Sequence, residues 1–167
     1  GNASGDAARL AVGTSGQVLT SDGTDVSWAA PAAASEAIIS LSLSATTGTF
    51  TTTFTTCAFN TTEYTSGTGD FTVSSGVVTI VNAGTYELSY DCSVDENAGN
   101  NRTEFVSRLL LNGTTEVGGT RGFIYSRLNA QGAGTASCRI IKTLSASDTI
   151  EMQAARNSGT NTGEFLG

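Results

Sequence analysis

The residues that could do chemistry are few, and Asp95-Glu96 is the clearest group among them. It is the only place in the sequence where two carboxylates adjoin. Paired carboxylates serve as general acid and base, for example in the hydrolysis of glycosides. The chain contains no histidine, which excludes the Ser–His–Asp and Cys–His arrangements. We therefore expect no enzyme, and we interpret this pair as part of a solvated polar loop.

The same stretch offers oxygen ligands for a metal ion. Carboxylate, hydroxyl and amide side chains follow one another between Asp91 and Asn97, and these are the ligand types that calcium prefers. The spacing is not that of an EF-hand. Asp95 and Glu96 are the candidate calcium ligands, and a polar loop without metal is the alternative. We expect no other cofactor.

Sugar binding requires aromatic faces with amide and guanidinium groups nearby, and residues 123–132 contain all of these. The candidate ligand residues of this run are Tyr125, Arg127, Asn129 and Gln131. The alternative is a core or trimer-interface strand in which Tyr125 is buried against its symmetry mates. Tyr64 is a second candidate, and we expect the polar residues 60–67 around it to form a loop.

The composition favours strands and excludes several kinds of partner. Charged residues make up only 14% of the chain, and threonine, serine and 20 glycines dominate the rest. Threonine favours strands, while glycine and serine favour turns. With a net charge of −7, the chain cannot present the broad basic surface that nucleic-acid binding requires. No apolar run approaches the roughly 20 residues that span a bilayer, so we expect no membrane insertion.

Three cysteines, Cys57, Cys92 and Cys138, cannot all pair within one chain. Each falls in a predicted strand, where a small buried thiol packs well. We predict three reduced, mostly buried thiols in a protein made in a reducing cytoplasm. One disulfide with one free thiol is the alternative.

Alternation of apolar and polar residues with a period of two predicts the strands. It is clearest over residues 86–94, where Tyr86, Leu88 and Tyr90 share one face. The segments expected as strands are 38–44, 50–54, 77–81, 86–94, 105–111, 123–125, 138–142 and 150–154. Turns are expected at Asn112-Gly113 and Ser147-Asp148. This number of short strands is typical of a sandwich or jelly roll.

Several of these motifs occur in the order found in the C1q/TNF-like jelly-roll family. Gly84-x-Tyr86 opens a strand, Asn112-Gly113 ends the next, and Ser147-Asp148 stands where the family has Gly-Asp. Residues 37–167 therefore resemble that family, with Phe165 in the last strand. The resemblance implies an antiparallel β-sandwich that assembles as a homotrimer. Tyr86, Leu88 and Tyr90 would then belong to the core or to the trimer contacts.

Residues 12–28 form a different kind of segment. Ser21-Asp22-Gly23 between two apolar patches predicts a tight hairpin. An isolated hairpin of this size is marginally stable, so we expect Trp28 to be buried by three copies around an axis. The stretch resembles a motif of bacteriophage tail fibres, matched here by Gly13, Gly16, Gln17, Val18, Leu19, Asp22, Gly23 and Trp28.

These observations predict two parts and a function. Residues 1–36 would form a shaft or attachment segment with a linker around Pro31, and residues 37–167 a head. The hypothesis is a virion fibre protein whose trimeric head is an adhesion or receptor-binding tip for a host-surface glycan or protein. The first segment would contact other virion proteins. The alternatives are an architectural capsid or tail fibre without a ligand, and a secreted C1q-like binding module.

Overall fold

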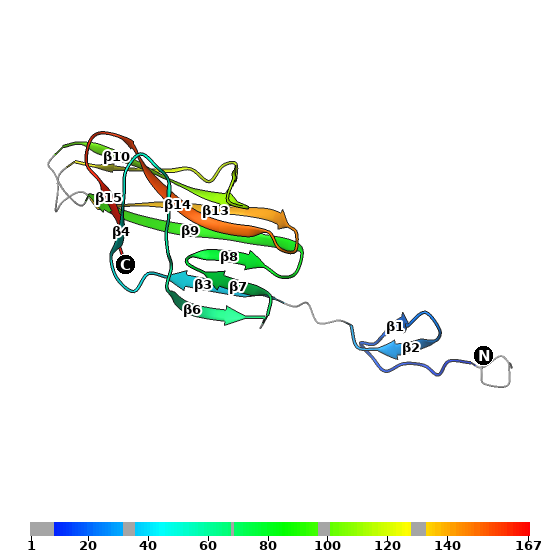
Figure 1. The fold of residues 1–167 in the computed structure, drawn as a ribbon. Coiled ribbons are helices and arrows are strands. Elements are labelled where there is room, and N and C mark those ends of the chain that lie inside the picture. Colours follow the sequence, from blue (N-terminus) through cyan, green and yellow to red (C-terminus); the bar gives the residue numbers. More distant parts are fainter. Residues whose placement is uncertain (1–8, 32–35, 68, 97–100, 128–132) are drawn as a thin grey trace. The chain divides into compact units, whose positions relative to one another are not determined.

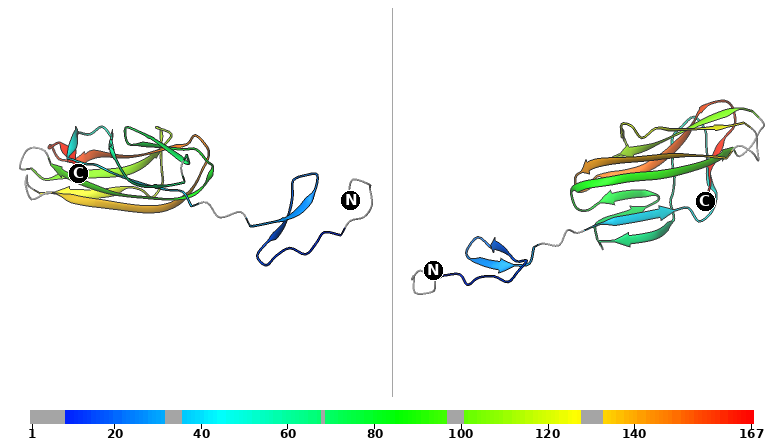
Figure 2. Two further views of the ribbon diagram at one scale, coloured as in Figure 1. Left: turned by 90° about the horizontal axis from the view of Figure 1, so that it is seen from below. Right: turned by 180° about the vertical axis from the view of Figure 1, so that it is seen from behind.

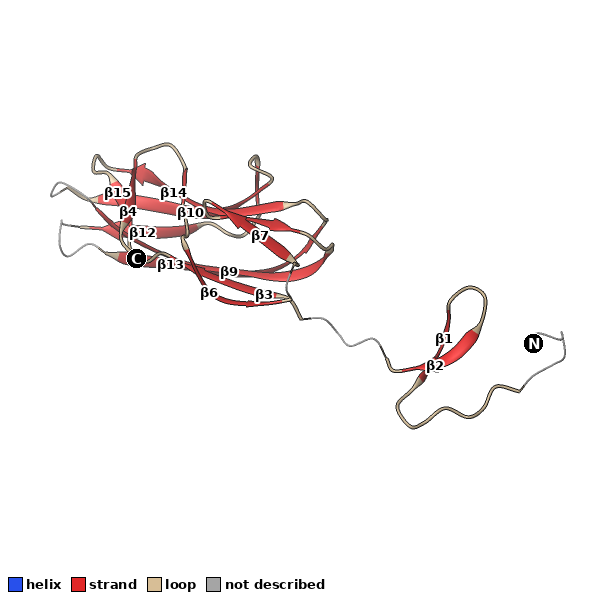
Figure 3. Ribbon diagram, turned by 60° about the horizontal axis from the view of Figure 1, so that its bottom comes forward, coloured by secondary structure: helices blue, strands red, loops and turns tan. Residues whose placement is uncertain are grey.

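The computed structural model describes residues 9–31, 36–67, 69–96, 101–127 and 133–167. The chain divides into two compact units, residues 1–35 and 36–167. Figure 3 shows strands and loops throughout the described residues, and every pairing between their strands is antiparallel. No helix among them is long and apolar enough to cross a membrane.

The first unit contains the predicted hairpin. Its strands are β1 (Val18–Ser21) and β2 (Val26–Ala29). Asp22 shapes the turn, because its Oδ1 accepts the backbone N–H groups of Thr24 and Asp25 at 2.8 and 2.7 Å. Gly23 supplies the positive φ of 93° that the turn requires. The turn residues thus form the hairpin as the sequence predicts.

Trp28 is partly covered within a single copy of this unit. Its indole Nε1 donates to the carbonyl of Ala11 at 2.7 Å, and its ring lies against Gly13, where an added Cβ would be 2.5 Å away. The side chain keeps 37% of its surface exposed. Residues 11–13 thus cover one part of the Trp28 ring, while the side chain stays exposed in a single copy; its burial by three copies stays a prediction.

The second unit is a sandwich of two antiparallel sheets (Figure 1, Figure 2). The strands of one sheet, in spatial order, are β13 (Gly134–Leu144), β9 (Gly84–Glu96), β15 (Gly163–Phe165) and β4 (Thr47–Phe50). The other runs β11 (Thr115–Glu116), β10 (Thr103–Leu111), β14 (Thr149–Ser158), β8 (Val77–Ile80) and β7 (Phe71–Ser74). In addition, β12 (Gly122–Ser126) pairs with β10, and β5 (Thr55–Thr56) pairs with β14.

This pairing confirms the predicted all-β antiparallel sandwich. The early strand β4 and the last strand β15 are neighbours, so strands far apart in the sequence close one sheet. Such connections between two facing sheets are those of a jelly roll. A separate pair, β3 (Ile38–Ser42) and β6 (Thr61–Ser66), completes the unit.

The alternation along β9 builds one side of the core. Tyr90 and Cys92 are buried there, while Tyr86 and Leu88 are partly buried and pack against the same core. The Tyr90 hydroxyl lies between the two sheets, 3.0 Å from Ser107 Oγ, and donates to the Thr120 carbonyl at 2.5 Å. The three residues assigned to core or trimer contacts thus belong to the core of one chain.

The two predicted turns form and bind each other. Asn112 and Gly113 both have positive φ angles, 54° and 66°, as the two central residues of a type I′ turn do. The Asn112 side chain donates to Asp148 Oδ1 at 2.8 Å and accepts the N–H of Thr149, also at 2.8 Å. The bond from Asn112, together with one from the Ser145 N–H, lowers the pKa of Asp148.

Two local predictions are wrong. Residues 50–54 do not form one strand, since β4 ends at Phe50, which packs edge-on against Phe105 at 5.6 Å between ring centroids. Phe54 lies elsewhere, 3.6 Å above the guanidinium of Arg108. The expected loop at residues 60–67 is largely the strand β6, because its threonines pair with β3.

Candidate ligand-binding site

Two aromatic side chains project from the outer face of β12, and we call Phe123 and Tyr125 the aromatic strip. They are 58% and 54% exposed, whereas Ile124 between them is buried in the core. Alternate residues of a strand point to opposite faces, so the inward Ile124 fixes both rings on the outside. Within one chain, Tyr125 is therefore not a core residue.

A fixed polar pair lies beside the aromatic strip. Glu104 on β10 stands directly opposite Tyr125 in the strand register, and Asn157 Nδ2 donates to Glu104 Oε1 at 2.6 Å. The register of β10 and β14 shifts between Glu104 and Phe105. This irregularity leaves Asn157 as an extra residue next to Glu104, as a β-bulge does. Stacking surfaces and hydrogen-bonding groups thus occur together on this face.

The other predicted sugar-binding residues have different positions. Arg127 is exposed immediately after β12, while Asn129 and Gln131 lie outside the described residues. Tyr64 is 56% exposed on β6. It belongs to the separate β3–β6 sheet rather than to the sheet that contains β12, so the two tyrosines are separate candidates.

The predicted calcium ligands do not converge. Asp95 and Glu96 lie on β9 rather than in a loop, and neighbouring strand residues point to opposite faces. Glu96 is only 2% exposed and accepts a hydrogen bond from Asn161 Nδ2. The Asp95 carboxylate instead accepts the backbone N–H of Glu96 at 2.8 Å. No cluster of three or more histidine, cysteine or acidic side chains occurs among the described residues.

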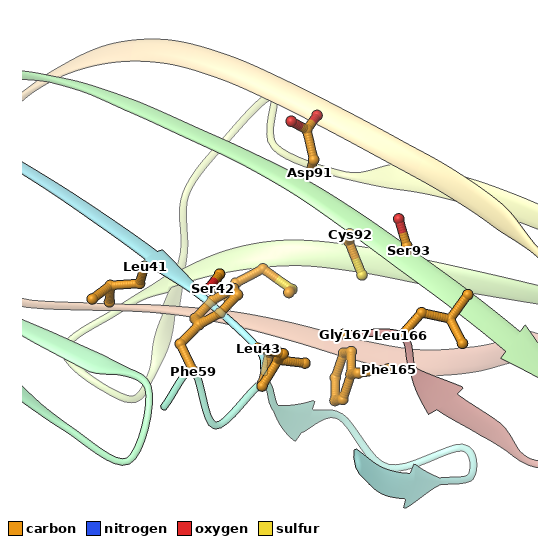
Figure 4. A pocket seen from close by; sticks show the side chains of 12 residues that line it. Leu41, Ser42, Leu43, Phe59, Asp91, Cys92, Ser93, Phe165, Leu166 and Gly167 are labelled. Atoms are coloured by element: carbon orange, nitrogen blue, oxygen red, sulfur yellow. The ribbon is translucent and has the colours of Figure 1, made fainter. Parts of the chain in front are cut away.

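A cavity of about 200 Å³ opens beside β9 and is lined partly by sulfur (Figure 4). Cys92 and Ser93 line it from β9, and Leu41 and Leu43 lie across from them. Its two cysteines, Cys57 and Cys92, are buried, and burial raises the pKa of each thiol to about 12.

The thiols of this cavity are poor nucleophiles at neutral pH, because the thiolate is the reactive form. Cys57 and Cys92 are unpaired, as is the partly buried Cys138. As predicted, Cys57 and Cys92 are buried, and the redox state of the three thiols stays a prediction. Burial explains the low reactivity of Cys57 and Cys92. Cys92 lies on β9, whereas Cys57 follows the short strand β5, so the expectation of a strand at Cys57 is wrong.

Comparison with known proteins gives likenesses of fold alone. No protein-family model matches the chain, and no curated protein matches it. The structure of murine APRIL at pH 8.5 is similar with a TM-score of 0.48 and 10% identity, over 78% of this chain and 97% of that one. The globular domain of zebrafish complement 1qA protein gives a TM-score of 0.45 and 13% identity, over 78% and 93%.

Sequence reasoning missed three residues of the candidate site. Phe123 could have been identified from the sequence, because it stands two positions before Tyr125 and shares its face if the run is a strand. Nothing in the sequence indicates that Glu104 and Asn157 belong to the site. They reach Tyr125 through the pairing of three strands and one register shift, which the sequence does not display.

Proposed function

We propose that this chain is a virion fibre protein whose sandwich unit assembles as a homotrimer and binds a host-surface glycan. The observation that carries the proposal is the aromatic strip beside the fixed Glu104–Asn157 pair. Aromatic rings cover the apolar faces of sugars, while carboxylate and amide groups bond their hydroxyls. The first unit, with its exposed hairpin, would attach the head to other virion proteins.

In a trimer, three weak sites would together bind a cell surface firmly. One shallow site on an open sheet face gives modest affinity, but three sites on one rigid head act together once the first is bound. Ile141 supports self-association, since it is 74% exposed on β13 in a single chain. The buried thiols and the absence of histidine support a binding protein rather than an enzyme.

The proposal is tested with purified protein on a glycan array and on host cells, with light scattering of the same samples. We expect a trimer that binds, and we expect Tyr125→Ala and Phe123→Ala to abolish binding while the trimer persists. Tyr64→Ala is the matched control, because that tyrosine is equally exposed on another sheet. Retained binding by Tyr125→Ala together with lost binding by Tyr64→Ala would move the site to β6.

Two further outcomes contradict the proposal. If Tyr125→Ala converts the trimer to monomers, the aromatic strip is a subunit contact and not a glycan site. If the unaltered trimer binds no glycan and no host strain, the chain is an architectural fibre.

A further inference from the structure

The pairing of β10 and β12 brings two arginines to the same end of the aromatic strip. The antiparallel pairing of β10 and β12 ends with Thr103 opposite Ser126. Arg102 directly precedes Thr103, and Arg127 directly follows Ser126. Their backbones are therefore neighbours, with Cα atoms roughly 5 Å apart if the strand spacing continues. Both residues are exposed.

These two side chains differ from the other arginines of the sandwich. Arg108 and Arg121 bind Glu116, Arg139 binds Glu87, and Arg156 donates to backbone carbonyls. Within the part of the chain that the structure describes, the side chains of Arg102 and Arg127 form no salt bridge or hydrogen bond.

An unpaired like-charged couple is costly unless something neutralises it. Like charges directly opposite each other on neighbouring strands are destabilising. The chain has only 8 lysines and arginines and a net charge of −7, so Arg102 and Arg127 form an unusual local concentration of positive charge. An anionic ligand would neutralise these two guanidinium groups and form hydrogen bonds with them.

We infer that the glycan bound at the aromatic strip is acidic, and that Arg102 and Arg127 hold its carboxylate or phosphate. The inference rests on the proposed function, because the aromatic strip must stack on sugar rings for the arginines to select among them. Guanidinium groups bind carboxylate and phosphate with paired hydrogen bonds. Sugars that carry either anion share this chemistry.

Glu104 determines the orientation of the bound glycan. Its carboxylate, held by Asn157, accepts sugar hydroxyl protons and repels an anion placed beside it. The acidic end of the ligand therefore lies at Arg102 and Arg127, and the neutral rings lie over Tyr125 and Phe123. Only a glycan with the anion at one end satisfies both groups.

The test is an array of matched pairs: a sialylated trisaccharide with its unsialylated disaccharide, and a hexose phosphate with the free hexose. We expect binding to an acidic member and at least tenfold weaker binding to its neutral counterpart. Arg102→Gln and Arg127→Gln should each weaken acidic binding by roughly tenfold, since each removes one charge-assisted interaction. Raising the NaCl concentration should weaken acidic binding further.

Arg139→Gln is the control, because it removes an exposed arginine from β13 and should leave binding unchanged. A preference for sialylated over phosphorylated probes, or the reverse, identifies the source of the anion. Equal binding to both members of each pair, or loss only with Arg139→Gln, would overturn the inference and leave the proposed glycan function intact. Absence of binding to every sugar and to host cells would overturn both.

Discussion

The Tyr90 hydroxyl offers the sharpest test of how the two sheets are held together. Tyr90→Phe deletes one oxygen and keeps the ring, so the apolar core is unchanged. In the structure that oxygen donates to the Thr120 carbonyl at 2.5 Å and lies 3.0 Å from Ser107 Oγ. All three residues are buried. Burial also raises the pKa of Tyr90, which keeps the hydroxyl protonated as a donor.

The expected loss in the free energy of unfolding follows from the polar groups that Tyr90→Phe leaves without a hydrogen-bond partner. Ser107 keeps a long contact of 3.5 Å to the Gly122 carbonyl, but the Thr120 carbonyl loses the side-chain donor from β9. A buried polar group without its partner costs about 1–3 kcal/mol. For a unit of this size, that loss lowers the melting temperature by roughly 3–10 °C.

Urea unfolding at a fixed protein concentration measures the difference in the free energy of unfolding. The control is Tyr86→Phe on the same strand, whose hydroxyl donates to the Asn82 carbonyl at 2.6 Å in a solvent-exposed position. We expect the control to cost less than about 1 kcal/mol, because water replaces the lost bond. Equal losses in both variants, or no loss in Tyr90→Phe, would refute the idea that this buried bond links the sheets.

Three other perturbations address the core, the thiols and the hairpin. Gly163→Ala should lower the free energy of unfolding by about 1–3 kcal/mol, because the new Cβ would lie 2.4 Å from a core phenylalanine ring. Urea titration measures this loss, and an unchanged unfolding midpoint would contradict the close packing. Cys57 and Cys92 keep their protons in the folded state up to about pH 12, whereas unfolded thiols ionise near 9.0. The stability that the two protonated thiols contribute should therefore be complete below pH 9 and disappear between about pH 9 and pH 12. Chemical denaturation should show a smaller fall in the free energy of unfolding over this pH range when both cysteines are alanine. Gly13→Ala should shift the fluorescence of Trp28, the only tryptophan, to longer wavelength without changing the unfolding of the sandwich; an unshifted spectrum would mean that the Trp28 ring does not rest on this glycine.

The sequence by itself determined the elements whose cause is local. The alternation that includes Tyr86, Leu88 and Tyr90 is a property of successive residues, and any strand with one buried face must place these side chains together. Asn112-Gly113 adopts positive φ at little cost, so its turn follows from residue type alone. Small thiols were likewise expected to be buried, and Cys57 and Cys92 are.

Only the tertiary structure decided which side of each element is available for function. Phe123-Ile124-Tyr125 is apolar on both faces, so its pattern could not show that Ile124 enters the core and the two rings face outward. Asp95-Glu96 looked like a loop because the length of β9 is set by pairing with β13 and β15 rather than by composition.

The candidate site shows the same division. Tyr125 was a plausible ligand from its type, but Glu104 and Asn157 join it through strand pairing and a register shift across distant parts of the chain. Arg102 and Arg127 come to the same end of the β10–β12 pair in the same way. The sequence supplies each side chain, but their convergence depends on long-range backbone hydrogen bonds, which no local pattern encodes.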